Sequence, residues 1–155
     1  GCTQQPQKVR NLSQKNQPDS VMMAQMAFNT HMADAADKAC RQWVKNDTIQ
    51  YTIDNFGFWY AKTTNLYADT LQKGEKVLAH IQICELNGTL LADIKDYFLV
   101  GSGDLPIAIN RCLKQMARGE EMRIVSPWYT AYGAEGTTLI QPYSNLVITL
   151  TTIEE

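Results

Sequence analysis

The sequence lacks the features that several classes of protein require. It has two histidines and four cysteines, and no two cysteines have Cys-x-x-Cys spacing. This argues against a structural zinc site and against a disulfide-built mini-protein. No apolar run approaches the ~18 residues of a membrane-spanning helix. Fourteen basic and sixteen acidic residues give a net charge of −2, which argues against a nucleic-acid-binding surface.

The sequence does contain enough apolar residues for a core. Of its 155 residues, 45% are hydrophobic and 19% are charged. These values are typical of one ordinary domain, or of one small domain with an appendage. Cys40, Cys84 and Cys112 each lie in an apolar or patterned context. We therefore interpret them as small buried thiols rather than as reactive ones.

Residues 1–18 are predicted to form a polar tether. Gly1 is not an initiator methionine, so either a signal segment has been removed or Gly1 was left by cloning. A cysteine at the head of a polar run is similar to the start of a mature bacterial lipoprotein, so we expect Cys2 to carry a lipid that anchors the chain to a membrane. The alternative is an incidental cysteine. We expect residues 3–17 to be poorly ordered, because they have no apolar period.

A long helix is predicted over residues 19–46. No proline or glycine occurs from Asp19 to Phe56, and alanine, the best helix former, is frequent. Asp19 or Ser20 can cap the first turn. The apolar stripe of this helix consists of Met22, Met26, Ala33, Ala36, Cys40 and Trp43. We favour packing of the stripe within the chain, while a dimer through the helix or contact with a partner stays open.

From Asp54 onward the apolar residues alternate with a period of two. Strands are predicted at 56–62, 77–84, from Leu90, and at 97–100, 121–125 and 145–153. Asn87-Gly88 predicts a hairpin, because a type I′ turn needs positive φ at both central residues. A short helix is predicted to begin with Asp104-Leu105-Pro106 and to end at Arg118-Gly119. The predicted fold class is α+β, with an antiparallel sheet of five or six strands curled around this helix.

Several motifs, in order, resemble the FKBP-type peptidyl-prolyl cis-trans isomerases. Met116-Ala117-Arg118-Gly119-Glu120 matches the family's M-x-x-G-E, and Ser126-Pro127 with Ala131-Tyr132-Gly133 matches its S-P-x-x-A-Y-G. Further matches are Lys73-Gly74-Glu75, Asn87-Gly88, Leu99-Val100-Gly101 and the segment Ile140-Gln141-Pro142 to Leu146-Val147-Ile148. The resemblance predicts an FKBP-like domain over residues 57–155. The leading helix and Cys2 are also similar to lipoprotein members of the family in Bacteroidetes.

The resemblance implies rotation about X-Pro bonds of proline-containing polypeptides, without a cofactor, a metal or a covalent intermediate. The barrier of ~18–20 kcal/mol comes from amide resonance, which the twisted transition state has lost. An apolar, water-free pocket complementary to the twisted form therefore lowers the barrier. The resemblance places this pocket between the sheet and the short helix.

The resemblance also assigns the pocket residues. Tyr132 matches the tyrosine whose hydroxyl bonds the substrate carbonyl. Pro106 lacks the backbone N–H that normally meets the ligand, and Ala92 occupies the usual aspartate position, with Asp93 one residue on and Asp96 where an aromatic residue is common. The remaining lining is aliphatic where the family is mostly aromatic, with Ile109 in place of a tryptophan floor. The expected substrate-binding residues are Ile81, Leu91, Leu105, Pro106, Ile109, Leu139 and Ile148.

We therefore expect a weak isomerase that acts on envelope or periplasmic proteins. The alternatives are a non-catalytic peptide-binding or partner-binding lipoprotein, and a scaffold whose working surface is the long helix. His80 is expected to face solvent, opposite Ile81. Trp128-Tyr129 lies in a loop one residue longer than that of the family, and is either a surface aromatic pair or a rim contact for a partner.

Overall fold

The structure is a computed structural model that describes residues 19–155. The predicted tether 1–18, with Cys2 and the expected disorder of residues 3–17, lies outside the described residues. The elements are α2 (Ser20–Asn46), β1 (Thr52–Ile53), β2 (Trp59–Lys62), β3 (Lys76–Glu85), β4 (Leu90–Leu99), α3 (Ile107–Leu113), β5 (Glu121–Ser126), a 3-10 turn (Trp128–Thr130) and β6 (Leu146–Ile153). The described residues divide into two units, the first ending at Met32 and the second running from Ala33 to Glu155, so their boundary falls within α2.

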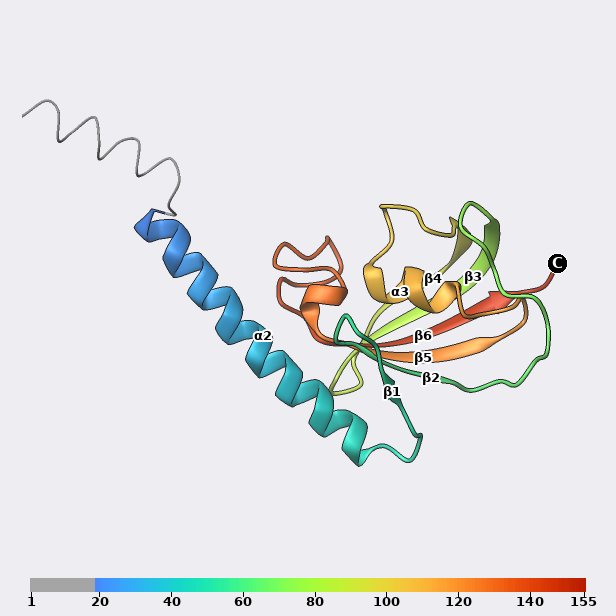
Figure 1. Ribbon diagram of the computed structural model, residues 1–155, viewed down its shortest axis with the longest axis horizontal. Helices are drawn as coiled ribbons and strands as arrows, with labels where there is room; N and C mark the ends of the chain where they lie inside the picture. Colours follow the sequence, from blue (N-terminus) through green and yellow to red (C-terminus); the bar gives the residue numbers. More distant parts are fainter. Residues whose placement is uncertain (1–18) are drawn as a thin grey trace, which may run out of the picture. The chain divides into compact units, whose positions relative to one another are not determined.

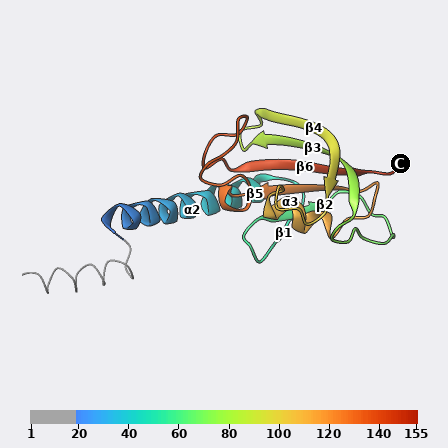
Figure 2. The same ribbon diagram turned by 90° about the horizontal axis from the view of Figure 1, so that it is seen from above.

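The second unit is built on one antiparallel sheet of six strands. The strand order is β1-β2-β5-β6-β3-β4, and Figure 2 shows β4 at one edge. The sheet curls around α3 (Figure 1). The buried faces of β3, β5 and β6 and of α3 form one hydrophobic cluster, as the alternating burial of β3 and β6 requires. The α+β fold class is confirmed.

The short helix begins later and ends earlier than predicted. α3 runs from Ile107 to Leu113, and its N-cap is Pro106, with no side-chain capping bond, so Asp104 does not cap it. Proline has no N–H to donate and a fixed φ, so the helix starts directly after it. The preceding loop is held by Asn110, whose side chain donates to Ser102 O (2.7 Å) and accepts from Gly101 N (2.9 Å).

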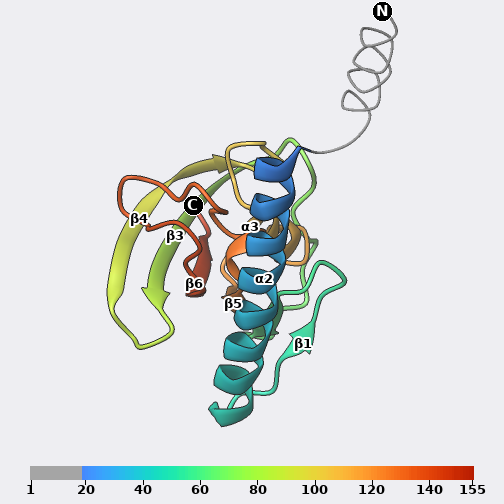
Figure 3. The same cartoon turned by 90° about the vertical axis from the view of Figure 1, so that its left-hand side faces the viewer.

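The two short strands predicted at Leu90 and at 97–100 form one continuous strand, β4. Ile83 pairs with Ala92 and Cys84 pairs with Leu90, so Leu91 is an extra residue in a β-bulge. Figure 3 shows β4 outside β3 on the curled side of the sheet. The prediction missed residues 92–96, where Asp93, Lys95 and Asp96 depress the strand signal.

The predicted long helix is confirmed, with bounds of Ser20–Asn46. Asp19 Oδ1 accepts a hydrogen bond from Met22 N (2.7 Å) and so caps the first turn. Within the second unit, Ala36 and Cys40 are buried, and Trp43 Nε1 donates to Leu86 O (3.0 Å). This part of the predicted stripe therefore packs within the chain, whereas Met22 and Met26 are exposed. Among residues 19–155, no helix combines the length and the apolar character needed to cross a bilayer.

The longer loop at Trp128-Tyr129 fastens the second half of α2. Trp128 is only 8% exposed and makes edge-on ring contacts with Tyr129 and Tyr143. The Tyr129 hydroxyl donates to Asp37 Oδ1 (2.5 Å). Two effects raise the pKa of Tyr129: its burial, which is the larger, and this hydrogen bond to a carboxylate. The aromatic pair is therefore an internal contact between the loop and α2.

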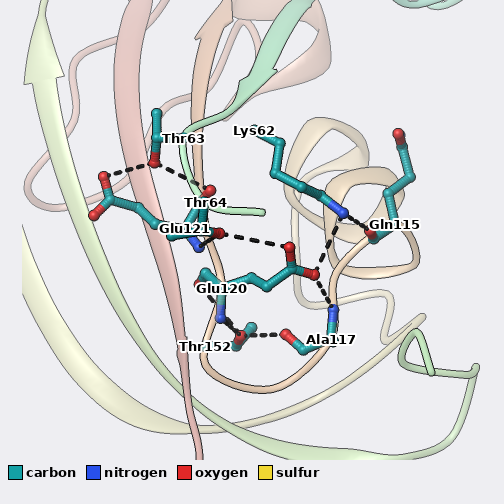
Figure 4. Close-up of polar contacts among 8 residues, drawn as sticks. All are labelled: Lys62, Thr63, Thr64, Gln115, Ala117, Glu120, Glu121 and Thr152. Atoms are coloured by element: carbon teal, nitrogen blue, oxygen red, sulfur yellow. Dashed lines mark hydrogen bonds and ion pairs between the residues drawn. The ribbon is translucent and has the colours of Figure 1, made fainter. Parts of the chain in front are cut away.

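A buried carboxylate joins β2, β6 and the turn after α3 (Figure 4). Glu120 is 1% exposed, and its Oε1 accepts from Ala117 N (2.7 Å) and pairs with Lys62 Nζ (3.3 Å). Thr152 Oγ1 donates to Ala117 O (2.6 Å) and accepts from Glu120 N (3.1 Å). Burial alone would raise the pKa of Glu120, but the bond from Ala117 and the ion pair with Lys62 outweigh it, so the pKa lies below its ordinary value.

We predict that Glu120→Gln lowers the free energy of unfolding by roughly 1–3 kcal/mol, because the amide loses the charge-assisted bonds while staying buried. A group whose pKa is depressed on folding stabilises the protein above its unfolded pKa, and that contribution is lost as the pH falls through the folded pKa. The difference between the variant and the wild type should therefore shrink below about pH 4.5, the ordinary glutamate value.

Urea unfolding at several pH values measures this difference. Glu121→Gln is the matched control, because Glu121 is only half-buried and bonds the exposed Thr63, and it should change stability much less. A difference between wild type and Glu120→Gln that stays constant from pH 7 to pH 3 would contradict the assigned role of the charge.

Candidate active site

Three isoleucines form the closed floor of the candidate site. Ile81 on β3, Ile109 on α3 and Ile148 on β6 are at most 2% exposed and belong to one hydrophobic cluster. Ile109 is placed by α3, whose buried side also carries Ala108 and Cys112. Because the three isoleucines are buried, a ligand would contact the side chains that cover them rather than the isoleucines themselves.

The surface above the floor is made by half-buried side chains. Leu91, Leu105 and Tyr132 pack against the same cluster. Leu91 reaches it from the β-bulge, and Leu105 precedes the N-cap of α3. The structure thus brings together six of the predicted residues: Ile81, Leu91, Leu105, Ile109, Tyr132 and Ile148.

Tyr132 offers a hydroxyl donor at this surface. Its hydroxyl has no hydrogen-bond partner among residues 19–155. Burial raises the pKa of Tyr132, so the phenol stays protonated and able to donate at neutral pH. Its backbone is fixed by Gly136 N, which donates to Tyr132 O (3.1 Å), and by Gly133 N, which donates to Trp128 O (2.9 Å).

Two predicted residues lie in other surroundings. Pro106 is buried as the N-cap of α3, where its carbonyl accepts from Asn110 N (3.0 Å). Leu139 is 61% exposed and is not part of the hydrophobic cluster. Leu139 lies in the loop between Thr137 and Ile140, whose ends are joined by a hydrogen bond of 2.7 Å from Thr137 N to Ile140 O.

The carboxylates of β4 lie on opposite faces of the sheet. Asp93 is paired with Gln82 on the outer face and binds His80 Nε2 (2.5 Å) and Gln82 Nε2 (3.3 Å). Asp93 therefore does not replace the carboxylate missing at Ala92. His80 lies on the face opposite Ile81, as predicted, and is partly exposed. Asp96 pairs with Ala79 and so lies on the inner face.

Sequence reasoning missed one apolar residue beside the site. Ile94 pairs directly with Ile81, so both side chains point to the inner face, and Ile94 is 37% exposed. Ala92, Ile94, Asp96 and Phe98 alternate with Asp93, Lys95 and Tyr97. This alternation would have revealed Ile94 had β4 been recognised as one strand.

A depression elsewhere on the domain has a different character. Its volume is about 600 Å³, and it is lined by residues 68–72 together with Glu75, Ala117, Arg118 and Glu154. An ion pair joins Arg118 to Glu75 there (3.3 Å). None of the predicted pocket residues lines it, and its charged wall does not suit a proline ring. We therefore assign the candidate site to the surface at Tyr132.

The chemistry available at the Tyr132 surface is apolar contact with one donated hydrogen bond. Within the described part of the chain, no group of three or more His, Cys, Asp or Glu side chains is placed to hold a metal ion. Burial raises the pKa of Cys40 to about 12 and also raises that of Cys112, so neither thiol supplies a thiolate nucleophile near neutral pH.

The profile of a known family matches most of this domain. Its description is FKBP-type peptidyl-prolyl cis-trans isomerase, and it matches residues 68–152. The chain belongs to this family. The matched residues include β3, β4, α3, β5, Tyr132 and most of β6, so the enzyme class predicted from the sequence, a peptidyl-prolyl cis-trans isomerase, is confirmed.

Solved structures share the FKBP-type fold. The peptidyl-prolyl cis-trans isomerase from Pseudomonas syringae pv. tomato is 23% identical, with a TM-score of 0.62 over 79% of this chain and 94% of its own. AtFKBP13 is 20% identical, with a TM-score of 0.62 over 69% of this chain and 99% of its own. FkpA from Escherichia coli is 17% identical, with a TM-score of 0.69 over 98% of this chain and 70% of its own. A comparison with curated protein sequences found no match.

We predict that Cys84 reacts with a thiol reagent well before Cys40 and Cys112. The prediction of a buried thiol is wrong for Cys84, which is half-buried, whereas the other two are buried and have raised pKa values. Mass spectrometry after brief labelling of a Cys2→Ser variant at pH 8 measures the order. Denaturant should equalise the three cysteines. Early labelling of Cys112 in the native protein would contradict the closed floor beneath Tyr132.

Proposed function

We propose that this chain isomerises X-Pro bonds of cell-envelope polypeptides, with lower efficiency than family members that have an aromatic pocket. The observation that carries the proposal is the hydroxyl of Tyr132, which no residue in 19–155 binds, above an aliphatic floor. The proline ring lies on Leu91, Leu105 and Ile94, and the preceding carbonyl accepts a hydrogen bond from Tyr132.

The proposed mechanism needs no proton transfer. Rotation removes the amide resonance that makes the ground state planar. The apolar surface excludes water that would favour the planar, polar amide. The Tyr132 hydroxyl holds the carbonyl while the bond turns, so catalysis comes from preferential binding of the twisted form.

Three substitutions support low efficiency. Ile109 replaces an aromatic floor, and aromatic packing adds ~0.5–1.5 kcal/mol beyond its area. Ala92 has no carboxylate and Pro106 has no N–H, and one hydrogen bond contributes ~1 kcal/mol. Together these losses are on the order of 2–3 kcal/mol, which corresponds to roughly a hundredfold in rate.

We predict that the wild type accelerates cis-trans exchange of a short X-Pro peptide, and that Tyr132→Phe reduces the acceleration roughly three- to tenfold, the equivalent of one hydrogen bond of ~1 kcal/mol. Exchange measured by NMR tests this. Tyr67→Phe is the control, since Tyr67 is 94% exposed, and it should leave the rate unchanged. A rate unaffected in Tyr132→Phe would remove the role assigned to Tyr132.

The second candidate function is a binding module without efficient catalysis. The complete burial of Ile109 favours it, because a proline ring cannot reach the floor without movement of the side chains above it. The same NMR experiment separates the two functions. Peptide binding without any acceleration would assign the chain to the binding module, and catalysis as fast as in aromatic-pocket enzymes would refute the proposed weakness.

We also propose that Cys2 carries a lipid and places the domain at a membrane facing the periplasm or the cell surface. The support is the position of Cys2 before a polar run. Two acyl chains or more would give stable anchoring, since each buried CH₂ contributes ~0.8 kcal/mol. A dimer through α2 is compatible with the exposure of Met22, Met26 and Phe28.

We predict that the mass of the protein purified from its native membrane exceeds the sequence mass by that of the acyl chains, and that Cys2→Ser releases the protein into the soluble fraction. Fractionation followed by mass spectrometry measures both. An unmodified Cys2 in the wild-type protein would end the proposal of anchoring without affecting that of catalysis.

A further inference from the structure

One edge of the sheet is a long strand whose outer side is unpaired among the described strands. β4 has ten residues, pairs only with β3 among the described strands, and contains no proline. Four apolar side chains along it are substantially exposed: Leu90, Ile94, Tyr97 and Leu99. Natural proteins usually protect such edges, because an unpaired strand is a template for another strand.

The outward backbone groups of β4 can be identified. Val100 N donates to Glu75 O (2.9 Å), and Val100 O accepts from Gly74 N (2.9 Å), so Val100 faces the β3 side. In an antiparallel strand, the N–H and C=O of one residue point to the same side, and those of the next residue point to the other side. The backbone groups of residues 93, 95 and 97 therefore point away from β3. Tyr97 agrees with this, since its N–H bonds Asp96 Oδ1 (2.7 Å) rather than β3. Asp93 and Lys95 therefore offer outward backbone groups that no residue in 19–155 binds.

We propose that β4 pairs antiparallel with β4 of a second copy of this chain across a two-fold axis. The two strands form hydrogen bonds only where outward-facing residues lie opposite each other. The outward-facing residues of β4 have odd numbers, so an odd-numbered residue must pair with an odd-numbered residue of the second copy. A two-fold axis makes the interface isologous, so each pair occurs twice unless a residue faces itself.

Charge selects one of these registers. With Ile94 on the axis, Asp93 lies opposite Lys95 of the partner subunit, and Lys95 lies opposite the partner's Asp93. Shifting the axis to residue 93 brings two aspartates together, and shifting it to residue 95 brings two lysines together. Opposite charges stabilise a cross-strand pair and like charges destabilise it. Lys95 has no ion pair with another residue in 19–155, so it is available.

This register also covers exposed side chains on the inner face of the sheet. Ile94 contacts the partner's Ile94, which covers an apolar side chain that is 37% exposed in one copy. Ala92 lies opposite the partner's Asp96, on the face that carries Ile81. The partner subunit's Asp96 thus brings a carboxylate next to Ala92, the position at which the family usually has an aspartate. The pairing joins two six-stranded sheets into one.

Disulfide trapping tests the register. Residues facing each other in a non-hydrogen-bonded pair have Cα atoms about 4.5 Å apart, a distance that a disulfide spans. In the full chain with Cys2→Ser and Cys84→Ser, Ile94→Cys should form a covalent dimer under mild oxidation roughly tenfold faster than Leu99→Cys. Leu99 is 53% exposed but lies far from its own copy in this register. Equal rates for the two variants would overturn the proposal.

Charge reversal tests the pairing without cysteines. Lys95→Glu places two like-charge pairs across the axis and should weaken the dimer roughly tenfold in analytical ultracentrifugation. The double variant Asp93→Lys with Lys95→Glu restores opposite charges and should restore the dimer. A double variant as weak as Lys95→Glu, or a dimer insensitive to both, would overturn the proposal and leave α2 as the dimer contact.

Discussion

The domain depends on the burial of one carboxylate. Glu120 reaches back to Ala117 N and to Lys62, and Thr152 closes the same turn from β6. The turn after α3 is therefore fixed to both sides of the sheet, and with it the angle at which α3 lies in the concave face. Ile109 occupies the floor of the candidate site because α3 is held in this way. The glutamate of the family motif is thus connected to α3 through the backbone of the turn that follows this helix.

The candidate site combines a rigid base with a sparse set of polar groups. Isoleucines fill the floor completely, so its shape is set by packing rather than by hydrogen bonds. One hydroxyl, that of Tyr132, projects from a turn that is held by backbone bonds to Trp128, Gly136 and Tyr143. A site of this kind distinguishes substrates by shape and apolar area, and has few means of orienting a polar backbone.

Much of the fold follows from pattern and turn chemistry. The alternation in β3 and β6 and the hairpin at Asn87-Gly88 follow from local sequence, and the motif around Glu120 and Tyr132 identifies the family. The predicted type I′ turn is wrong, because Gly88 has positive φ and Asn87 does not; Gly88 N instead donates to Glu85 O (2.9 Å). The continuity of β4 did not follow, because Asp93, Lys95 and Asp96 have low strand propensity, although the backbone pairs with β3 on both sides of the bulge at Leu91. The contact of Tyr129 with Asp37 was also beyond sequence reasoning, since it joins residues 92 positions apart.

That separation has a consequence for the order of folding. During synthesis, residues 33–46 leave the ribosome before Trp128 and Tyr129 have been added to the chain. Cys40 and Trp43 are therefore exposed until the rest of the domain has folded. Closing a loop of this length is entropically costly until the sheet has brought its ends together. We therefore expect the second half of α2 to be among the last parts of the domain to dock. Until it docks, the apolar side of this helix is exposed and can bind chaperones that hold nascent chains.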